Sequence, residues 1–263
     1  IKIDNSSSPF IDNSIIKGNI SESNGGAITA LQSQFYLKNT IIDSNIVTMG
    51  GSSWGGGIYC QNSDFTLHNT IIRRNSADRG GAIYLHYTSD PLIINTLLIE
   101  NYASDVGGGI YCQENSNPIS LNSIFWNNSP EQVYFRAEEQ QNQGSINIAY
   151  SDLQGGENGI VTNNNGTVNW LDGNLDVDPL FIDPDNGNYH LQDYSLLIGA
   201  GIDSVDIDGT WYHAPDTDIE GNPRPNPEGS NPDIGAYENS YGEPQHNSLI
   251  YVSTDGNDSG SFG

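Results

Sequence analysis

The chain has 263 residues, of which 33 are acidic and only 8 are basic, so its formal net charge is −25 at neutral pH. This charge argues against nucleic acid and anionic membrane surfaces as partners, because their negative groups need Lys and Arg to neutralise them. The 30 glycines and single methionine favour short strands and tight turns over helices. No stretch approaches the roughly 20 apolar residues of a membrane span, which excludes insertion by an apolar helix.

The first two thirds of the chain repeat one phrase. Its clearest copy runs through residues 65–85, and related copies occupy residues 35–60 and 92–112. Each copy carries asparagines at two registered positions: Asn13, Asn39, Asn69, Asn95 and Asn122 in one series, and Asn19, Asn45, Asn75, Asn101 and Asn128 in the other. Self-similarity at a spacing of 26 to 30 residues indicates a solenoid of stacked supersecondary units.

The content of each copy predicts a parallel β-helix. Apolar residues alternate over short segments, which is the period of a strand. Asparagine tolerates the left-handed backbone of a sharp bend, and its amide can bond the same amide in the next coil. A leucine-rich horseshoe has a similar period but needs a helix in each repeat, which segments so rich in Gly and Asn do not favour. We therefore expect an all-β solenoid.

Alternation also assigns side chains to the inside of this solenoid. We expect one buried column of Ile28, Ile58, Ile83, Ile110 and Val133, and a second of Ala30, Cys60, Leu85, Cys112 and Phe135. Cys60 and Cys112 would then lie two coils apart, roughly 9–10 Å from each other. A disulfide needs Cα atoms within about 7 Å. The sequence therefore predicts two free, buried thiols.

Between these columns lie outward positions that form the candidate binding surface. One outward column contains Tyr59, Tyr84, Tyr111 and Tyr134, and the next contains Gln61, His86, Gln113 and Arg136. A row of aromatic rings on a flat sheet suits contact with sugar faces. The alternative is that tyrosine is a strong strand former whose rings stack for stability alone.

The asparagine turns and the recurring Gly-Gly-[Gly/Ala]-Ile-Tyr phrase resemble the pectate-lyase-like superfamily of right-handed parallel β-helices, over roughly residues 5–165. The resemblance implies that the tyrosine sheet corresponds to the sheet that lines the saccharide cleft. Residues 178–192, 218–224 and 233–238 resemble the end of bacterial surface β-helices of the choice-of-anchor Q type, in which this segment closes the solenoid. Residues 250–258 are similar to a phrase that opens a new β-helix.

These observations predict three parts. Residues 1–170 form the coils of a right-handed parallel β-helix, residues 171–241 form an irregular acidic C-terminal cap, and residues 242–263 form a linker that leads toward a following β-helix unit.

The acidic segment contains a candidate calcium site. Asp172, Asn174, Asp176 and Asp178 place oxygen ligands at every second position, and calcium takes six to eight such oxygens. The alternative is that these residues only form turns in a solvated cap. Calcium is the only cofactor that the sequence suggests.

The tyrosine sheet does not carry an obvious catalytic set. A glycoside hydrolase needs two carboxylates about 5–9 Å apart, and the outward positions contain neither Asp nor Glu. We therefore expect a non-catalytic extracellular or cell-surface module of a longer tandem protein. It would bind a polysaccharide or cell-surface glycan, or serve as an adhesin or stalk beside neighbouring β-helix units. The alternative is a polysaccharide lyase or another carbohydrate-active enzyme of the same fold.

Overall fold

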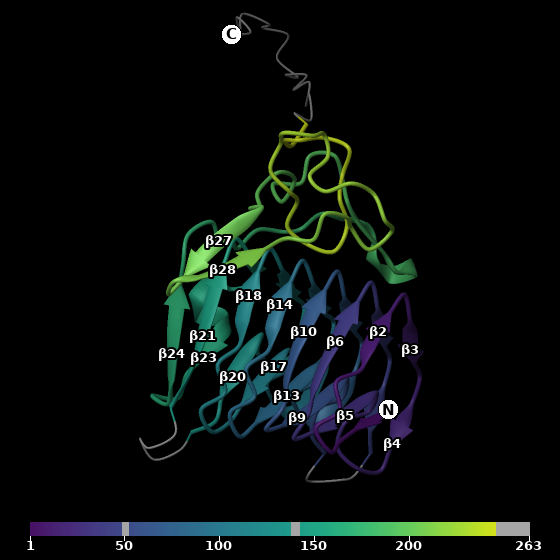
Figure 1. Ribbon diagram of the computed structural model, residues 1–263, viewed down its shortest axis with the longest axis vertical. Coiled ribbons are helices and arrows are strands. Elements are labelled where there is room, and N and C mark those ends of the chain that lie inside the picture. Colours follow the sequence, from purple (N-terminus) through teal and green to yellow (C-terminus); the bar gives the residue numbers. More distant parts are fainter. Residues whose placement is uncertain (49–52, 138–142, 246–263) are drawn as a thin grey trace, which may run out of the picture.

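The computed structural model describes residues 1–48, 53–137 and 143–245. The chain forms a parallel β-solenoid in which successive coils stack strand on strand into four sheets (Figure 1). Equivalent residues of neighbouring repeats pair directly, as Tyr84 does with Tyr59 on one side and Tyr111 on the other. This arrangement confirms the all-β parallel solenoid predicted from the repeat.

The sheets are named here in the order in which the chain enters them. Sheet A contains β1 (Lys2–Ile3), β5 (Ile28–Leu31), β9 (Ile58–Gln61), β13 (Ile83–His86), β17 (Ile110–Cys112), β20 (Val133–Phe135) and β23 (Ile160–Val161). Sheet B contains β2 (Phe10–Asp12), β6 (Gln34–Lys38), β10 (Asp64–His68), β14 (Leu92–Ile94), β18 (Ile119–Leu121), β21 (Gly144–Ala149) and β24 (Gly166–Trp170).

Sheet C contains β3 (Ile15–Lys17), β7 (Ile41–Asp43), β11 (Ile71–Arg73), β15 (Leu97–Ile99), β19 (Ile124–Trp126) and β22 (Asp152–Leu153). Sheet D contains β4 (Ile20–Ser21), β8 (Ile46–Val47), β12 (Ser76–Arg79) and β16 (Tyr102–Val106). The remaining elements are the hairpins β25 (Phe181–Asp183) with β26 (Asn188–Leu191) and β27 (Ser204–Ile207) with β28 (Thr210–His213), and the 3-10 helices η1 (Gly156–Gly159) and η2 (Pro184–Asn186). Neither helical segment in the described residues has the length and apolar character needed to cross a membrane.

The core of the solenoid follows the predicted inward columns. Ile58, Ile83 and Ile110 of the first column are fully buried. Cys60 and Leu85 of the second column are fully buried as well. Both cysteines are free and buried, which confirms the prediction from their spacing. Burial raises the pKa of each thiol, so both remain protonated and pack as small apolar groups.

The two asparagine series share the two predicted tasks unequally. The first series bends the chain between sheets B and C, and Asn39, Asn69 and Asn95 have φ values of 47–48°. Its amides bond between coils only in places, as from Asn69 to Asn39 Oδ1 over 3.1 Å, whereas the second series forms a continuous ladder. The side-chain amide of Asn45 donates to Asn75 Oδ1 over 2.9 Å, and that of Asn75 donates to Asn101 Oδ1 over 3.0 Å. At this second bend the preceding residue takes the left-handed backbone, which leaves the ladder asparagines free to point inward.

The glycine phrase reflects the close stacking of coils at the entry to sheet A. Gly55 has a φ of 69°, a region that residues with a side chain rarely adopt. A Cβ on Gly56 would lie 2.4 Å from the backbone oxygen of Gly81 in the next coil. Side chains are therefore excluded at both positions.

Residues 171–245 form an irregular segment, called here the lateral segment. Residues near Leu175 still pair with β22 at the end of sheet C, and most of the rest lies along the side of the solenoid, above the turns that follow β10, β14 and β18 (Figure 1). The outward column of sheet C explains this position, because Ile71, Leu97 and Ile124 are apolar and become buried against Leu197 and Ile234.

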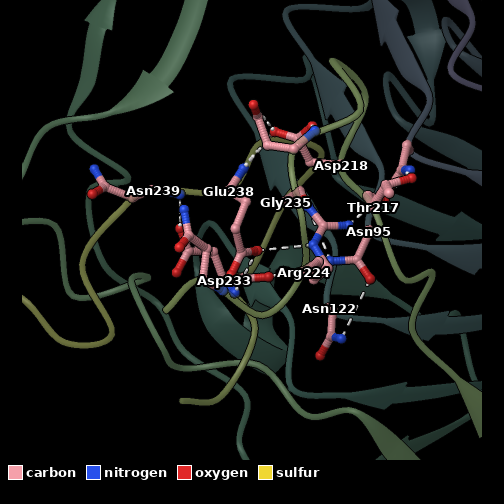
Figure 2. Close-up of polar contacts among 12 residues, drawn as sticks. Asn95, Asn122, Thr217, Asp218, Arg224, Asp233, Gly235, Glu238 and Asn239 are labelled. Atoms are coloured by element: carbon pink, nitrogen blue, oxygen red, sulfur yellow. Dashed lines mark hydrogen bonds and ion pairs between the residues drawn. The ribbon is translucent and has the colours of Figure 1, made fainter. Parts of the chain in front are cut away.

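A buried polar network fixes the lateral segment to the asparagine turns (Figure 2). The Arg224 guanidinium donates to Glu238 Oε2 over 2.9 Å and to Asn69 Oδ1 over 2.7 Å. The amide of Asn95 donates to the backbone oxygens of Asp233 and Gly235. The first asparagine series therefore serves a further purpose as the attachment row for this segment.

Charged residues of the third repeat form ion pairs with neighbouring coils. Arg73 contacts Asp43 over 2.9 Å and Arg74 contacts Glu100 over 2.6 Å. Burial alone would raise the pKa of Asp43. Hydrogen bonds from Lys17, Ser44 and Arg73 outweigh burial and hold it at about 2. These ion pairs therefore join neighbouring coils of the stack.

Candidate functional site: the outer face of sheet A

The predicted tyrosine column exists, but most of it is buried. Ring centroids lie 5.5 Å apart between Tyr59 and Tyr84, 4.7 Å between Tyr84 and Tyr111, and 5.6 Å between Tyr111 and Tyr134. The first three residues are only 1–3% exposed, and Tyr134 is half-buried. The rings form a small apolar cluster outside the main core. In this arrangement the central rings have no open face to offer a ligand.

The cover over the tyrosines comes from the segments that lead into sheet A. Trp54 stacks on Tyr84 with a centroid distance of 5.3 Å, and on Tyr59 at 6.2 Å. Val106, at the end of β16, packs against the same cluster. Trp54 directly precedes Gly55 and Gly56 in the sequence, so an aromatic residue beside the glycine phrase could have indicated this cover. It was not among the predicted site residues.

The second outward column forms hydrogen bonds with the tyrosine hydroxyls. The Tyr59 hydroxyl bonds to His86 Nδ1 over 3.1 Å and donates to Gln61 Oε1 over 3.2 Å. The Tyr84 hydroxyl donates to Gln113 Oε1. Burial raises the pKa of Tyr59 to about 12 and that of Tyr84 further. Both phenols therefore stay protonated at neutral pH and do not provide a tyrosinate base.

The end of this polar row carries a carboxylate that the sequence analysis did not include. Glu114 accepts a hydrogen bond from the Gln113 amide over 3.0 Å, and its other oxygen lies 3.8 Å from His86 Nε2. Arg136, the last member of the column, is half-buried.

An open groove lies over the first three strands of sheet A. Its volume is about 630 Å³, which is within the range of small-molecule sites. Lys2, Thr29, Leu31, Tyr59 and Gln61 line its floor. Thr29 pairs directly with Tyr59, so the tyrosine column continues here with a much smaller side chain. The groove lies where threonine takes the place of tyrosine in this column.

The wall of the groove comes from the first approach to sheet A, residues 19–26. Asn19, Ser21, Ser23 and Asn24 line it with amides and hydroxyls. The hydroxyl of Thr29 donates to the backbone oxygen of Asn24 over 2.6 Å and holds the wall against the floor. The lining contains one basic side chain, that of Lys2, and no carboxylate, although 33 of the 263 residues are acidic.

Three of the four predicted calcium ligands accept backbone hydrogen bonds through their side chains, and Asp172 accepts one through its backbone oxygen. The backbone oxygen of Asp172 accepts from Tyr150 N, and Asn174 Oδ1 accepts from the backbone of Ser151. Asp176 Oδ1 accepts from Gly155 N and Asp178 Oδ1 accepts from Leu180 N. Within residues 1–48, 53–137 and 143–245, no group of three His, Cys, Asp or Glu side chains is placed to hold a metal ion. The calcium site stays a prediction, which a comparison of melting temperature with and without chelator would test.

Comparison with known families accounts for most of the chain. The family described as the right-handed β-helix region matches residues 1–176. The chain belongs to this family. The match ends before Asp178, so the resemblance to choice-of-anchor Q proteins stays a prediction. No curated protein and no solved structure matches the chain. Residues 250–258, which resemble the start of another unit, lie outside the described residues.

Proposed function

We propose that the chain is a non-catalytic module of an extracellular or cell-surface protein and binds a neutral saccharide in the groove over β1, β5 and β9. The observation that carries the proposal is the lining of this groove, which combines amides and hydroxyls with apolar groups and has no carboxylate. Ligand sites typically pair an apolar surface with a few polar groups that fix orientation. A polysaccharide or cell-surface glycan offers matching hydroxyls and apolar ring faces.

The position of the groove supports this role. It lies on the outer face of sheet A, and sheet C, on another side of the coil, is covered by the lateral segment. Of the eight residues predicted to bind ligand, Tyr59 and Gln61 line the groove. Tyr84 and Tyr111 would support the floor from the neighbouring coils, because their rings continue the stack that begins at Tyr59.

The experiment is a glycan array followed by titration of the best neutral oligosaccharide. Thr29→Trp fills the groove and should weaken binding at least tenfold. Gln61→Ala removes one amide and should weaken it about twofold to tenfold, the value of one ordinary hydrogen bond. Gln34→Ala is the matched control, because Gln34 is exposed on sheet B and does not line the groove. Unchanged binding in Thr29→Trp would exclude the groove as the site.

A panel of pectate, alginate and neutral glycans tests the alternative of a polysaccharide lyase, because elimination requires a uronic acid. A lyase produces an unsaturated product, which absorbs in the ultraviolet. Release of that product from any glycan in the panel, and its loss in His86→Ala, would replace the proposed binding function with catalysis. We expect no absorbance change.

A further inference from the structure

A second pocket lies between the solenoid and the lateral segment. Its volume is about 290 Å³, near the lower end of the range of small-molecule sites. Trp126 and Glu100 line it from the solenoid, and Asp178, Phe181 and Gln192 line it from the lateral segment. The pocket is remote from the groove on sheet A, with which it shares no residue.

The register of sheet C places the tryptophan. Arg73, Ile99 and Trp126 occupy the same column on successive strands, so Trp126 is the large aromatic member of a row that faces the lateral segment. It is half-buried, although its neighbour Phe125 is fully buried in the core. The solenoid therefore presents part of an indole ring at this junction.

The opposite wall holds an uncommon backbone conformation. Leu180 has a φ of 56°, in the left-handed region that branched apolar residues rarely adopt. Two hydrogen bonds hold it there: Leu180 N donates to Asp178 Oδ1 over 2.9 Å, and Gln192 N donates to Leu180 O over 2.9 Å. Strained residues that are fixed by their surroundings occur preferentially at ligand sites.

The charge of the lining is negative. Glu100 and Asp178 are carboxylates, and no Lys, Arg or His is among the residues that line the pocket. Arg74 offsets Glu100, since its Nε lies 2.6 Å from Glu100 Oε2. Asp178 therefore contributes the larger uncompensated charge, in a chain whose formal net charge is −25.

We propose that this pocket binds a small ligand that carries an ammonium group. A tryptophan ring together with a carboxylate attracts such a cation through the ring quadrupole and through direct charge pairing. Trp126 and Asp178 would provide these two contacts, and Phe181 and Gln192 would limit the size of the ligand. The inference does not depend on the saccharide groove.

Choline and glucosamine are the probes, each titrated into the whole chain and followed by the indole N–H signals in NMR spectra. The neutral controls are 3,3-dimethylbutanol, which has the shape of choline, and glucose. At least one cation should bind at least ten times more tightly than its neutral analogue, with a shift of the Trp126 signal. Preference for choline would identify a quaternary ammonium and preference for glucosamine an amino sugar. Equal binding of cation and neutral analogue in both pairs, or binding of neither cation, would overturn the proposal.

Variants then locate the site. Trp126→Ala should weaken binding of the preferred cation at least tenfold, and Trp126→Phe should restore part of it. Asp178→Asn keeps the acceptor for Leu180 N and should weaken binding severalfold with a smaller dependence on salt. Trp211→Ala and Asp185→Asn are the controls, since both residues are exposed and do not line the pocket. Thr29→Trp should leave cation binding unchanged, so failure of the groove proposal and failure of this one are distinguishable.

Discussion

The coils and the lateral segment are stabilised by different kinds of contact. In the coils each interaction recurs at one repeat's spacing, as in the ladder from Asn45 through Asn75 to Asn101. In the lateral segment each contact occurs once, as with Arg224, which joins Glu238 of its own segment to Asn69 of the solenoid. Recurrence makes the coil contacts visible in the sequence. The single contacts become visible only in the folded chain.

The comparison also explains which faces remain open. Sheet C has an apolar outward column that starts at Ile15 and reaches Ile124, and the lateral segment covers it from Ile71 onward. Sheet A carries tyrosines that cover one another and leave a polar groove at Thr29.

The largest effect is expected at the buried ion pair between Arg224 and Glu238. Arg224→Leu leaves the carboxylate of Glu238 buried without its partner, which should lower the free energy of unfolding by about 3–5 kcal/mol. Urea denaturation measures the change. Arg79→Leu is the matched control, because the Arg79–Asp105 pair is largely exposed and should contribute less than about 1 kcal/mol. Equal effects of the two variants would show that the network in Figure 2 does not anchor the segment.

The second largest loss of unfolding free energy is expected in the asparagine ladder. Asn75→Ala removes hydrogen-bond partners from Asn45, Ile42 and Asn101 in a fully buried position, at a cost of about 2–4 kcal/mol. Asn13→Gly, in the turn series, should cost less than about 0.5 kcal/mol, because glycine adopts the same left-handed backbone. If Asn13→Gly were the more damaging change, the division of tasks between the two series would be wrong.

A pH effect is expected where a carboxylate interrupts the apolar column of sheet C. Asp152 pairs with Ile124 and is fully buried. Burial, with Asp176 and Asp178, raises its pKa to about 7. Between pH 5 and pH 7 the folded protein therefore holds a proton that the unfolded chain has released. Asp152 alone should lower the free energy of unfolding by about 2 kcal/mol as the pH rises through this interval.

Asp152→Asn should remove this contribution to the pH dependence. Asp233, whose pKa burial and Glu238 also raise to about 7, should continue to contribute in that variant. Denaturation of both proteins at several pH values measures the difference. Identical pH profiles would show that Asp152 does not titrate in this range.

The smallest effect is expected from the cysteines. Because Cys60 and Cys112 are buried and free, the native chain should not react with a thiol reagent, and reductant should leave its melting temperature unchanged. Both thiols should react once the chain is unfolded. A loss of stability on reduction would indicate a disulfide and contradict the stacking order.

Much of the solenoid could be predicted because the same residue pattern recurs in each coil. Ile83 and Leu85 follow from alternation, and the separation of Cys60 from Cys112 follows from the coil order. The cover of Trp54 over Tyr84 did not follow, because it depends on the path of a loop of variable length. The burial of Asp152 beneath residues 175–178 and the pocket at Trp126 did not follow either, because they depend on how the lateral segment packs on sheet C.

Hydrogen exchange of the whole chain, with and without the best-binding neutral oligosaccharide, tests the central claim most directly. The account predicts slower exchange of backbone amides in residues 19–31 and 58–61, which line the groove, with no change in β11, β15 and β19 of sheet C. Protection confined to sheet C or to the lateral segment, with residues 19–31 unaffected, would contradict the assignment of the outer face of sheet A as the saccharide site.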